Sequence, residues 1–115
     1  MPHFPTVFSP VKLRHRELSN RVVFGPHTVN MSNEGLPGDR HFGYYRERAR
    51  GGAAMIVVEP VPAHRTGVLI RGNFLAESDE VISHFRRITE ECHSHGTTMI
   101  HQIYHVGGHG DQDNS

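Results

Sequence analysis

The sequence has no tryptophan, one cysteine, and no excess of either charge, with 12 basic and 12 acidic residues. Because Cys92 has no second cysteine to pair with, no disulfide can form within the chain, and we expect a reducing, cytoplasmic setting. The balanced charge creates no overall field that would attract nucleic acid or an anionic membrane surface. The expected partner is therefore a small molecule.

Other signals are missing as well. Pro2, His3 and Pro5 stand where a secretion signal needs a basic start and an apolar run. No apolar stretch approaches the roughly 18 residues that suggest a membrane span. What is present is an ordinary globular composition, with 36% hydrophobic and 21% charged residues in a chain of 115. This composition indicates one small folded domain and argues against disorder.

Three short apolar runs resemble strands buried on both faces, and they occupy residues 22–24, 53–58 and 97–103. Two helices are predicted between them, the first capped by Asp39 and ended by Gly51 and Gly52, the second capped by Ser78 or Asp79. Their apolar faces have helical spacing and comprise Phe42, Tyr45 and Ala49 in the first helix and Ile82, Phe85, Ile88 and Cys92 in the second.

This order of strands and helices predicts an α/β fold with a parallel sheet and right-handed crossovers. Three strands cover less than half the ring of a (β/α)8 barrel, which needs about 250 residues. We therefore predict about three βα units from the N-terminal part of such a TIM barrel, interrupted in a loop. Residues 1–20 would form a cap hairpin, and residues 21–115 the first three strands and two helices of the barrel. A three-stranded flavodoxin-like sheet is the competing fold.

Candidate site residues follow from the topology, because the carboxyl ends of parallel strands converge on one face of the sheet. Thr28 follows the first predicted strand, Pro60 the second, and Gln102 lies at the end of the third. Each also has a simpler explanation, since threonine often forms turns and buried amides commonly bond backbone groups.

A metal site has less support. His101, His105 and His109 recur every four residues, but no carboxylate or cysteine completes the set, so we expect no metal. Cys92 lies on an apolar helical face and is expected to be an inert core thiol. No GxGxxG motif follows a strand, which leaves a doubly wound nucleotide-binding domain without support.

The ordered combination of short motifs is more specific. Three blocks resemble the old yellow enzyme family in order and spacing. The first contains Phe8-Ser9-Pro10-Val11, Asn20-Arg21-Val22-Val23 and Gly25-Pro26-His27-Thr28, and the second contains Tyr44-Tyr45, Arg48-Ala49, Gly51-Gly52 and Glu59. The third contains His93, Gly96, Gln102 and His105-Val106-Gly107. The resemblance implies an FMN-binding TIM barrel. In such a fold Pro26, His27 and Thr28 would lie along the flavin ring.

The same resemblance assigns roles to single residues. Thr28 would be catalytic, its hydroxyl tuning the flavin, and Gln102 would bond the pyrimidine side of the ring. Pro60 occupies a place where relatives offer a backbone N–H, which proline lacks. Because Thr28 stands where the trimethylamine dehydrogenase branch often has a cysteine, the FMN is expected to be non-covalent.

The function implied is an oxidoreductase that passes hydride from NAD(P)H through FMN to an activated alkene. Gly107, Gly108 and His109 are closer to the amine dehydrogenase branch, so an N-methylamine dehydrogenase or demethylase is the alternative. A non-catalytic βαβ interaction domain and a histidine-rich metal-binding module are alternatives of other classes. The 115 residues alone are expected to be inactive. The sequence is compatible with a homo-oligomer of the full-length protein.

Overall fold

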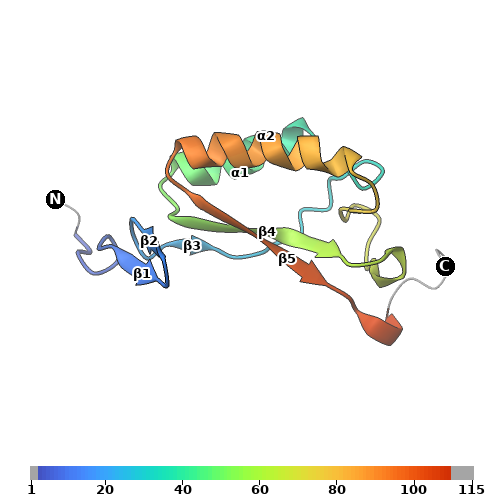
Figure 1. Cartoon of the computed structure of the whole chain (residues 1–115), viewed down its shortest axis with the longest axis horizontal. Coiled ribbons are helices and arrows are strands. Elements are labelled where there is room, and N and C mark those ends of the chain that lie inside the picture. The colour runs from blue at the N-terminus through green and yellow to red at the C-terminus, as the bar shows by residue number, and fades with distance from the viewer. Residues whose placement is uncertain (1–2, 110–115) are drawn as a thin grey trace.

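The computed structural model describes residues 3–109. In chain order its elements are β1 (Val11–Leu13), β2 (Arg16–Leu18), β3 (Val23–Phe24), α1 (Asp39–Arg50), β4 (Met55–Pro62), α2 (Glu80–Ser94) and β5 (Thr98–Tyr104), with short 3-10 turns at Arg65–Gly67 and Gly107–His109. Figure 1 shows the two helices together on one face of the sheet, with the β1–β2 hairpin at the N-terminal end of the molecule. None of the helices in the described part of the chain is long and apolar enough to cross a membrane.

The main sheet has the order β3-β4-β5, and both pairs are parallel. The registers place Met55 of β4 beside Val23 on one side and beside Thr98 on the other. All three strands therefore end at the same edge, as the sequence predicted. Between β4 and β5 the register shifts between Val58 and Val61, so the ladder is irregular just where the strands approach this edge.

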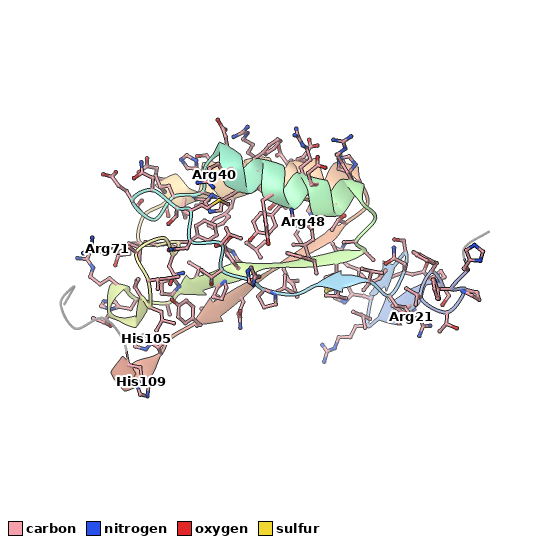
Figure 2. The ribbon with its side chains drawn as sticks, turned by 180° about the vertical axis from the view of Figure 1, so that it is seen from behind. Arg21, Arg40, Arg48, Arg71, His105 and His109 are labelled. Carbon is pink, nitrogen blue, oxygen red and sulfur yellow. The ribbon has the colours of Figure 1, made fainter. Side chains whose placement is uncertain are left out.

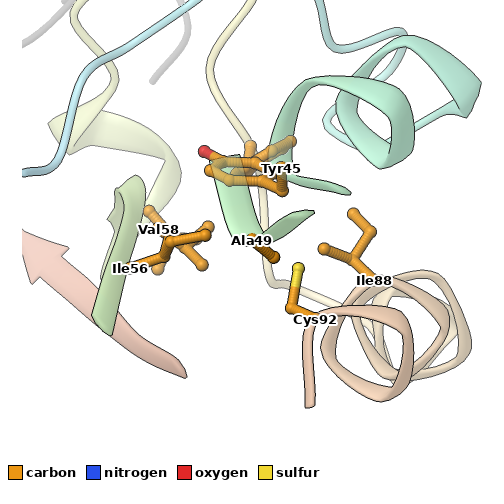
Figure 3. Packing of buried hydrophobic residues seen from close by; sticks show 8 residues of the cluster. Tyr45, Ala49, Ile56, Val58, Ile88 and Cys92 are labelled. Atoms are coloured by element: carbon orange, nitrogen blue, oxygen red, sulfur yellow. The ribbon is translucent and has the colours of Figure 1, made fainter. Parts of the chain in front are cut away.

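The hydrophobic core lies between β4 and the two helices (Figure 3). Its buried members come from all three elements and from the loop after β4: Tyr45, Ala49, Ile56, Val58, Val61, Phe74, Ile88 and Cys92. Full burial of each large aliphatic side chain contributes about 1.5–3 kcal/mol, so these positions hold the helices on the sheet. The predicted helical faces are confirmed at Tyr45, Ala49, Ile88 and Cys92.

The outer strands differ from the prediction of burial on both faces. Val23 of β3 is 48% exposed, and Ile100 and Ile103 of β5 are 46% and 71% exposed. Within residues 3–109, β3 and β5 each have a neighbouring strand on one side only, and the helices cover one face of the sheet. Because burial needs a neighbouring layer, only β4 has the buried character expected of all three strands.

Helix boundaries also required correction. Gly38, and not Asp39, is the cap of α1, and its N–H donates to Nδ1 of His41 at 3.0 Å. Asp39 is the first helical residue and pairs with Arg87 of α2 at 2.7 Å. In α2, Asp79 is the cap as predicted, although its side chain makes no capping hydrogen bond.

Two further predictions were wrong in detail. Ile82 is 47% exposed and its neighbour Val81 is buried, so the buried stripe of α2 begins one residue earlier than its spacing suggested. Glu59 and Pro60 were expected to follow the second strand, but β4 continues through them to Pro62. The register shift accommodates them within the strand.

The hairpin pairs β1 with β2 in antiparallel register and turns at Arg14, which has φ 54°. Asn20 connects it to the turn between α1 and β4, because its side-chain amide donates to the carbonyl of Gly52 at 2.8 Å. The division into residues 1–20 and 21–115 stays a prediction, and residues 1–2 and 110–115 lie outside the described part.

We predict that Ile88→Ala lowers the free energy of unfolding by about 2–5 kcal/mol, because it leaves a cavity between α2 and β4. Ile82→Ala, in the same helix but on its exposed side, should change that free energy by about 0.5 kcal/mol or less. Urea denaturation of both variants, made in the full-length protein, provides the measurement. Equal losses would contradict the placement of α2.

Candidate functional site

A pocket of about 310 Å³ opens at the carboxyl ends of the strands. It brings together Thr28 from beyond β3, Pro60 from β4 and Gln102 from β5, three residues predicted from strand ends alone. The remaining lining residues are Leu69, Ile70, Asn73, Tyr104 and Val106. Pro26 and His27 are exposed and do not line this pocket, so the structure gathers three of the five predicted residues.

The polar groups of the pocket are available to a ligand. Thr28 and Gln102 line the pocket, and within the part of the chain described their side chains make no hydrogen bond to the protein. A hydroxyl and an amide together offer both donors and acceptors, as a heteroaromatic ring with alternating C=O and N–H groups requires. Pro60 adds apolar surface and no N–H. This donor set fits the pyrimidine edge of a flavin.

The pocket wall formed by the β4–α2 loop is held from two sides. On β5, the Tyr104 hydroxyl donates to Oδ1 of Asn73 at 2.6 Å, and Asn73 is only 3% exposed. From the β3–α1 loop, the Ser32 hydroxyl donates to the Asn73 carbonyl at 2.5 Å. The Gly72 N–H donates to Oδ1 of Asn30 at 2.8 Å, and a Cβ on Gly72 would collide with Asn30. The wall is therefore fixed in place.

A second connection lies at the rim of the same face. The His105 ring packs against Gly67, where an added Cβ would lie 2.8 Å from the ring. His105 Nδ1 accepts the N–H of Gly107 at 2.9 Å, which anchors the ring. Figure 2 shows His105, His109 and Arg71 at this end of the molecule, away from the hairpin end that carries Arg21. The first 3-10 turn is thus packed on the end of β5.

Glu59 is the buried charge behind the pocket, with an exposed fraction of 1%. Its Oε1 accepts the Tyr45 hydroxyl of α1 at 2.7 Å, and its Oε2 accepts the backbone N–H of Val29 at 3.2 Å. The Glu59 N–H in turn donates to the Tyr45 hydroxyl oxygen at 3.1 Å. One carboxyl group therefore connects β4 with α1 and with the segment that carries Thr28.

Opposing effects act on this carboxyl group. Burial raises the pKa of Glu59, while the hydrogen bonds from Tyr45 and Val29 and the nearby His27 lower it, and burial is the larger effect. Burial also raises the pKa of Tyr45, so its hydroxyl keeps its proton and acts as the donor. Glu59 is thus a titratable group whose neighbour in β4, Pro60, lines the pocket.

The histidine spacing does not produce a metal centre in the region described. Among residues 3–109 no group of three or more histidine, cysteine, aspartate or glutamate side chains is placed to hold a metal ion. His101 instead packs edge-on against Phe85, with ring centroids 4.6 Å apart. Cys92 is a free, fully buried thiol, and burial raises its pKa to about 11, which agrees with the predicted inert thiol.

Sequence reasoning missed several residues of the site. Leu69, Ile70 and Asn73 come from a long loop with no periodic pattern, although the apolar pair Leu69-Ile70 stands out in a polar stretch. Glu59 was expected just after the second strand, Tyr45 was expected at an apolar helical position, and both belong to a family motif, but neither was named among the site residues. Their pairing depends on the packing of α1 over β4.

Residues 6–115 match the family described as NADH:flavin oxidoreductase / NADH oxidase. The chain belongs to this family. The match covers nearly all the described residues and all three strands that supply the pocket. Members of the NADH:flavin oxidoreductase family are oxidoreductases that use a flavin, which agrees with the resemblance carried by the sequence motifs.

Two relatives and one solved structure illustrate the likeness. The NADH oxidase of Thermoanaerobacter brockii is 33% identical over 109 residues, which are 93% of this chain and 17% of the relative. The probable N-methylproline demethylase of Rhizobium meliloti is 32% identical over 108 residues, 93% of this chain and 16% of the relative. The old yellow enzyme of a Pichia species is 25% identical with a TM-score of 0.84, covering 92% of this chain and 28% of that structure.

This chain thus spans less than a third of the length of these members of the NADH:flavin oxidoreductase family. The structural likeness identifies its strands and helices as part of the family's (β/α)8 barrel, and the competing flavodoxin-like sheet is set aside. The exposed edges of β3 and β5 are positions where a barrel places further strands.

We predict that Tyr45→Phe lowers the free energy of unfolding by about 1–3 kcal/mol, because Oε1 of the buried Glu59 loses its donor. Tyr44→Phe is the matched control in the same helix. The ring of Tyr44 stacks with Arg48 at 3.7 Å, and phenylalanine keeps that stacking, so a change within about 0.5 kcal/mol is expected. Chemical denaturation of both variants measures the difference, and equal effects would refute the role of the hydroxyl.

The second prediction concerns pH. Since burial raises the pKa of Glu59 above its ordinary value of 4.5, the folded protein retains a proton that the unfolded chain releases first. The stabilisation that this proton gives is complete below the pKa of Glu59 in the unfolded chain. It is lost as the pH rises through the pKa of Glu59 in the folded protein. The stability of the wild type relative to Glu59→Gln should therefore fall as the pH rises from below 4.5 through the raised pKa of the folded protein. Unfolding free energies measured across that range would disprove this if the difference stayed constant.

Proposed function

We propose that the protein is an FMN-dependent oxidoreductase that takes hydride from NAD(P)H and passes it to an activated alkene. The observation that supports this most is the meeting of Thr28, Pro60 and Gln102 in one pocket, at the strand edge where a barrel of this family has its mouth. The flavin, when bound, supplies the hydride chemistry, while the protein orients and polarises it.

Each residue has a defined part in this proposal. The Thr28 hydroxyl, the proposed catalytic group, would donate a hydrogen bond toward the O4 and N5 edge of the ring. The Gln102 amide would bond the pyrimidine side, and Pro26 and His27, which lie outside the pocket described above, would lie along the ring. Pro60 contributes surface without an N–H, so one backbone contact offered by relatives is replaced by apolar packing.

The flavin is proposed to be held without a covalent bond. A covalent link of the kind formed by cysteine needs a reactive thiolate beside the ring. Thr28 offers a hydroxyl at that place, and Cys92 is buried in the core between α2 and β4, on the helical side of the sheet. The flavin should therefore be released when the protein is denatured.

A second candidate substrate class is an N-methylated amine. It is favoured by the relative described as a probable N-methylproline demethylase, whose identity to this chain nearly equals that of the NADH oxidase. We suggest measuring turnover of 2-cyclohexenone and of N-methylproline, each with NADH and with NADPH. The comparison separates the two substrate classes and identifies the nicotinamide donor. Both activities are proposed for the full-length protein, and the 115 residues alone are expected to be inactive.

We predict that native mass spectrometry of the protein from its natural source finds one non-covalent FMN per chain. A folded protein without flavin would instead favour the non-catalytic interaction domain. Uptake of zinc or nickel would favour the metal-binding module.

Thr28→Ala and Gln102→Ala should each weaken FMN binding about tenfold, since each removes one hydrogen bond of about 1.4 kcal/mol. Thr89→Ala on α2, outside the pocket, should leave the dissociation constant unchanged.

A further inference from the structure

Among residues 3–109, Glu59 is the one buried carboxyl group, and it contacts segments that flank the pocket without lining the pocket itself. Pro60, its neighbour in β4, lies on the pocket surface, and Val29, which donates to it, follows Thr28 directly. The carboxyl group thus lies behind two of the three strand-end residues of the proposed flavin site.

The hydrogen bonds around Glu59 match an ionised carboxylate. Both oxygens accept, one from the Tyr45 hydroxyl and the other from the Val29 N–H. A protonated carboxyl would have to aim its own O–H at one of these donors. Ionised, Glu59 fixes the peptide that carries Thr28 and places a negative charge in a region shielded from water, where charges act over longer range.

Such a charge matters to a flavin in front of it. A flavin bound there would gain one negative charge if it took one hydride, two electrons with one proton, from NAD(P)H, which would leave as NAD(P)+. A fixed negative charge behind the pocket wall opposes that gain, and loss of the fixed charge favours it.

We propose that Glu59 is a positioning residue of the flavin site: its carboxylate fixes Thr28 through the Val29 N–H, and its charge state sets how readily the bound flavin is reduced. This inference rests on the proposed function. It predicts that the midpoint potential of the flavin changes when Glu59 gains or loses its proton. A glutamate with a purely structural role would not have this effect.

Other titratable groups surround Glu59. His27 comes from the β3–α1 loop and its positive form lowers the pKa of Glu59, and Tyr45 comes from α1. On β5, packing lowers the pKa of His101 while the backbone of Glu59 acts in the opposite direction. A positive charge on a nearby histidine favours the ionised form of Glu59. The change that belongs to Glu59 must therefore be identified by substituting Glu59.

The test is a spectroscopic redox titration of the FMN-loaded, full-length protein over a range of pH. Glu59→Gln removes the charge and keeps the shape, and Glu90→Gln, exposed on α2, is the control with the same change in net charge. We expect Glu59→Gln to bind FMN with a more positive midpoint potential than the wild type. The difference should disappear at low pH, where the wild-type carboxyl is itself protonated, and Glu90→Gln should follow the wild type throughout.

A Glu59→Gln protein that binds FMN with the wild-type midpoint at every pH overturns the inference and leaves the proposed function intact. If the wild type binds no FMN, the proposed function fails and the inference fails with it. Tyr45→Phe provides a second variant if Glu59→Gln does not fold. It keeps the carboxyl group but removes a donor, so the pH at which the midpoint changes should move upward, and an unmoved transition also overturns the inference.

Discussion

The buried Glu59 carboxyl group is the interaction on which the arrangement of the site depends. A charge with 1% exposure is tolerated only when its oxygens are bonded, and the two donors come from residues 14 and 30 positions away. To satisfy them, α1 must lie over β4 at one height and the segment after β3 must turn back toward the sheet. The hydrophobic contacts of Tyr45 alone would permit other positions, because apolar packing is not directional.

The sheet is built around β4. It contributes Ile56 and Val58 to the helical side, Glu59 to the polar contact and Pro60 to the pocket, all within residues 56–60. The register shift between Val58 and Val61 allows one strand to supply these different environments, since a regular alternation would send neighbouring side chains strictly to opposite faces. Core and site therefore meet within a few residues, and a change in one is transmitted to the other.

The sequence predicted the order of elements because each apolar run and each helical stripe is a local property of the chain. It also predicted that Thr28, Pro60 and Gln102 meet, because parallel strands end at one edge. It could not predict the exposure of Val23 and Ile103, since an apolar run indicates a surface suited to burial and not which neighbours cover it. Nor could it place Asn73 or pair Tyr45 with Glu59, because the path of a long loop and the height of a helix on a sheet are settled by tertiary packing.

The fit of Gly72 against Asn30 has a consequence for the way a ligand is exchanged. The loop bearing Leu69 and Ile70 is ordered by the protein's own contacts, so its conformational entropy is lost during folding and not again when a ligand arrives. A pocket prepared in this way gains affinity from preorganisation, but its wall cannot swing aside as a hinged lid does. A ligand that arrives would therefore meet a wall already in its final position.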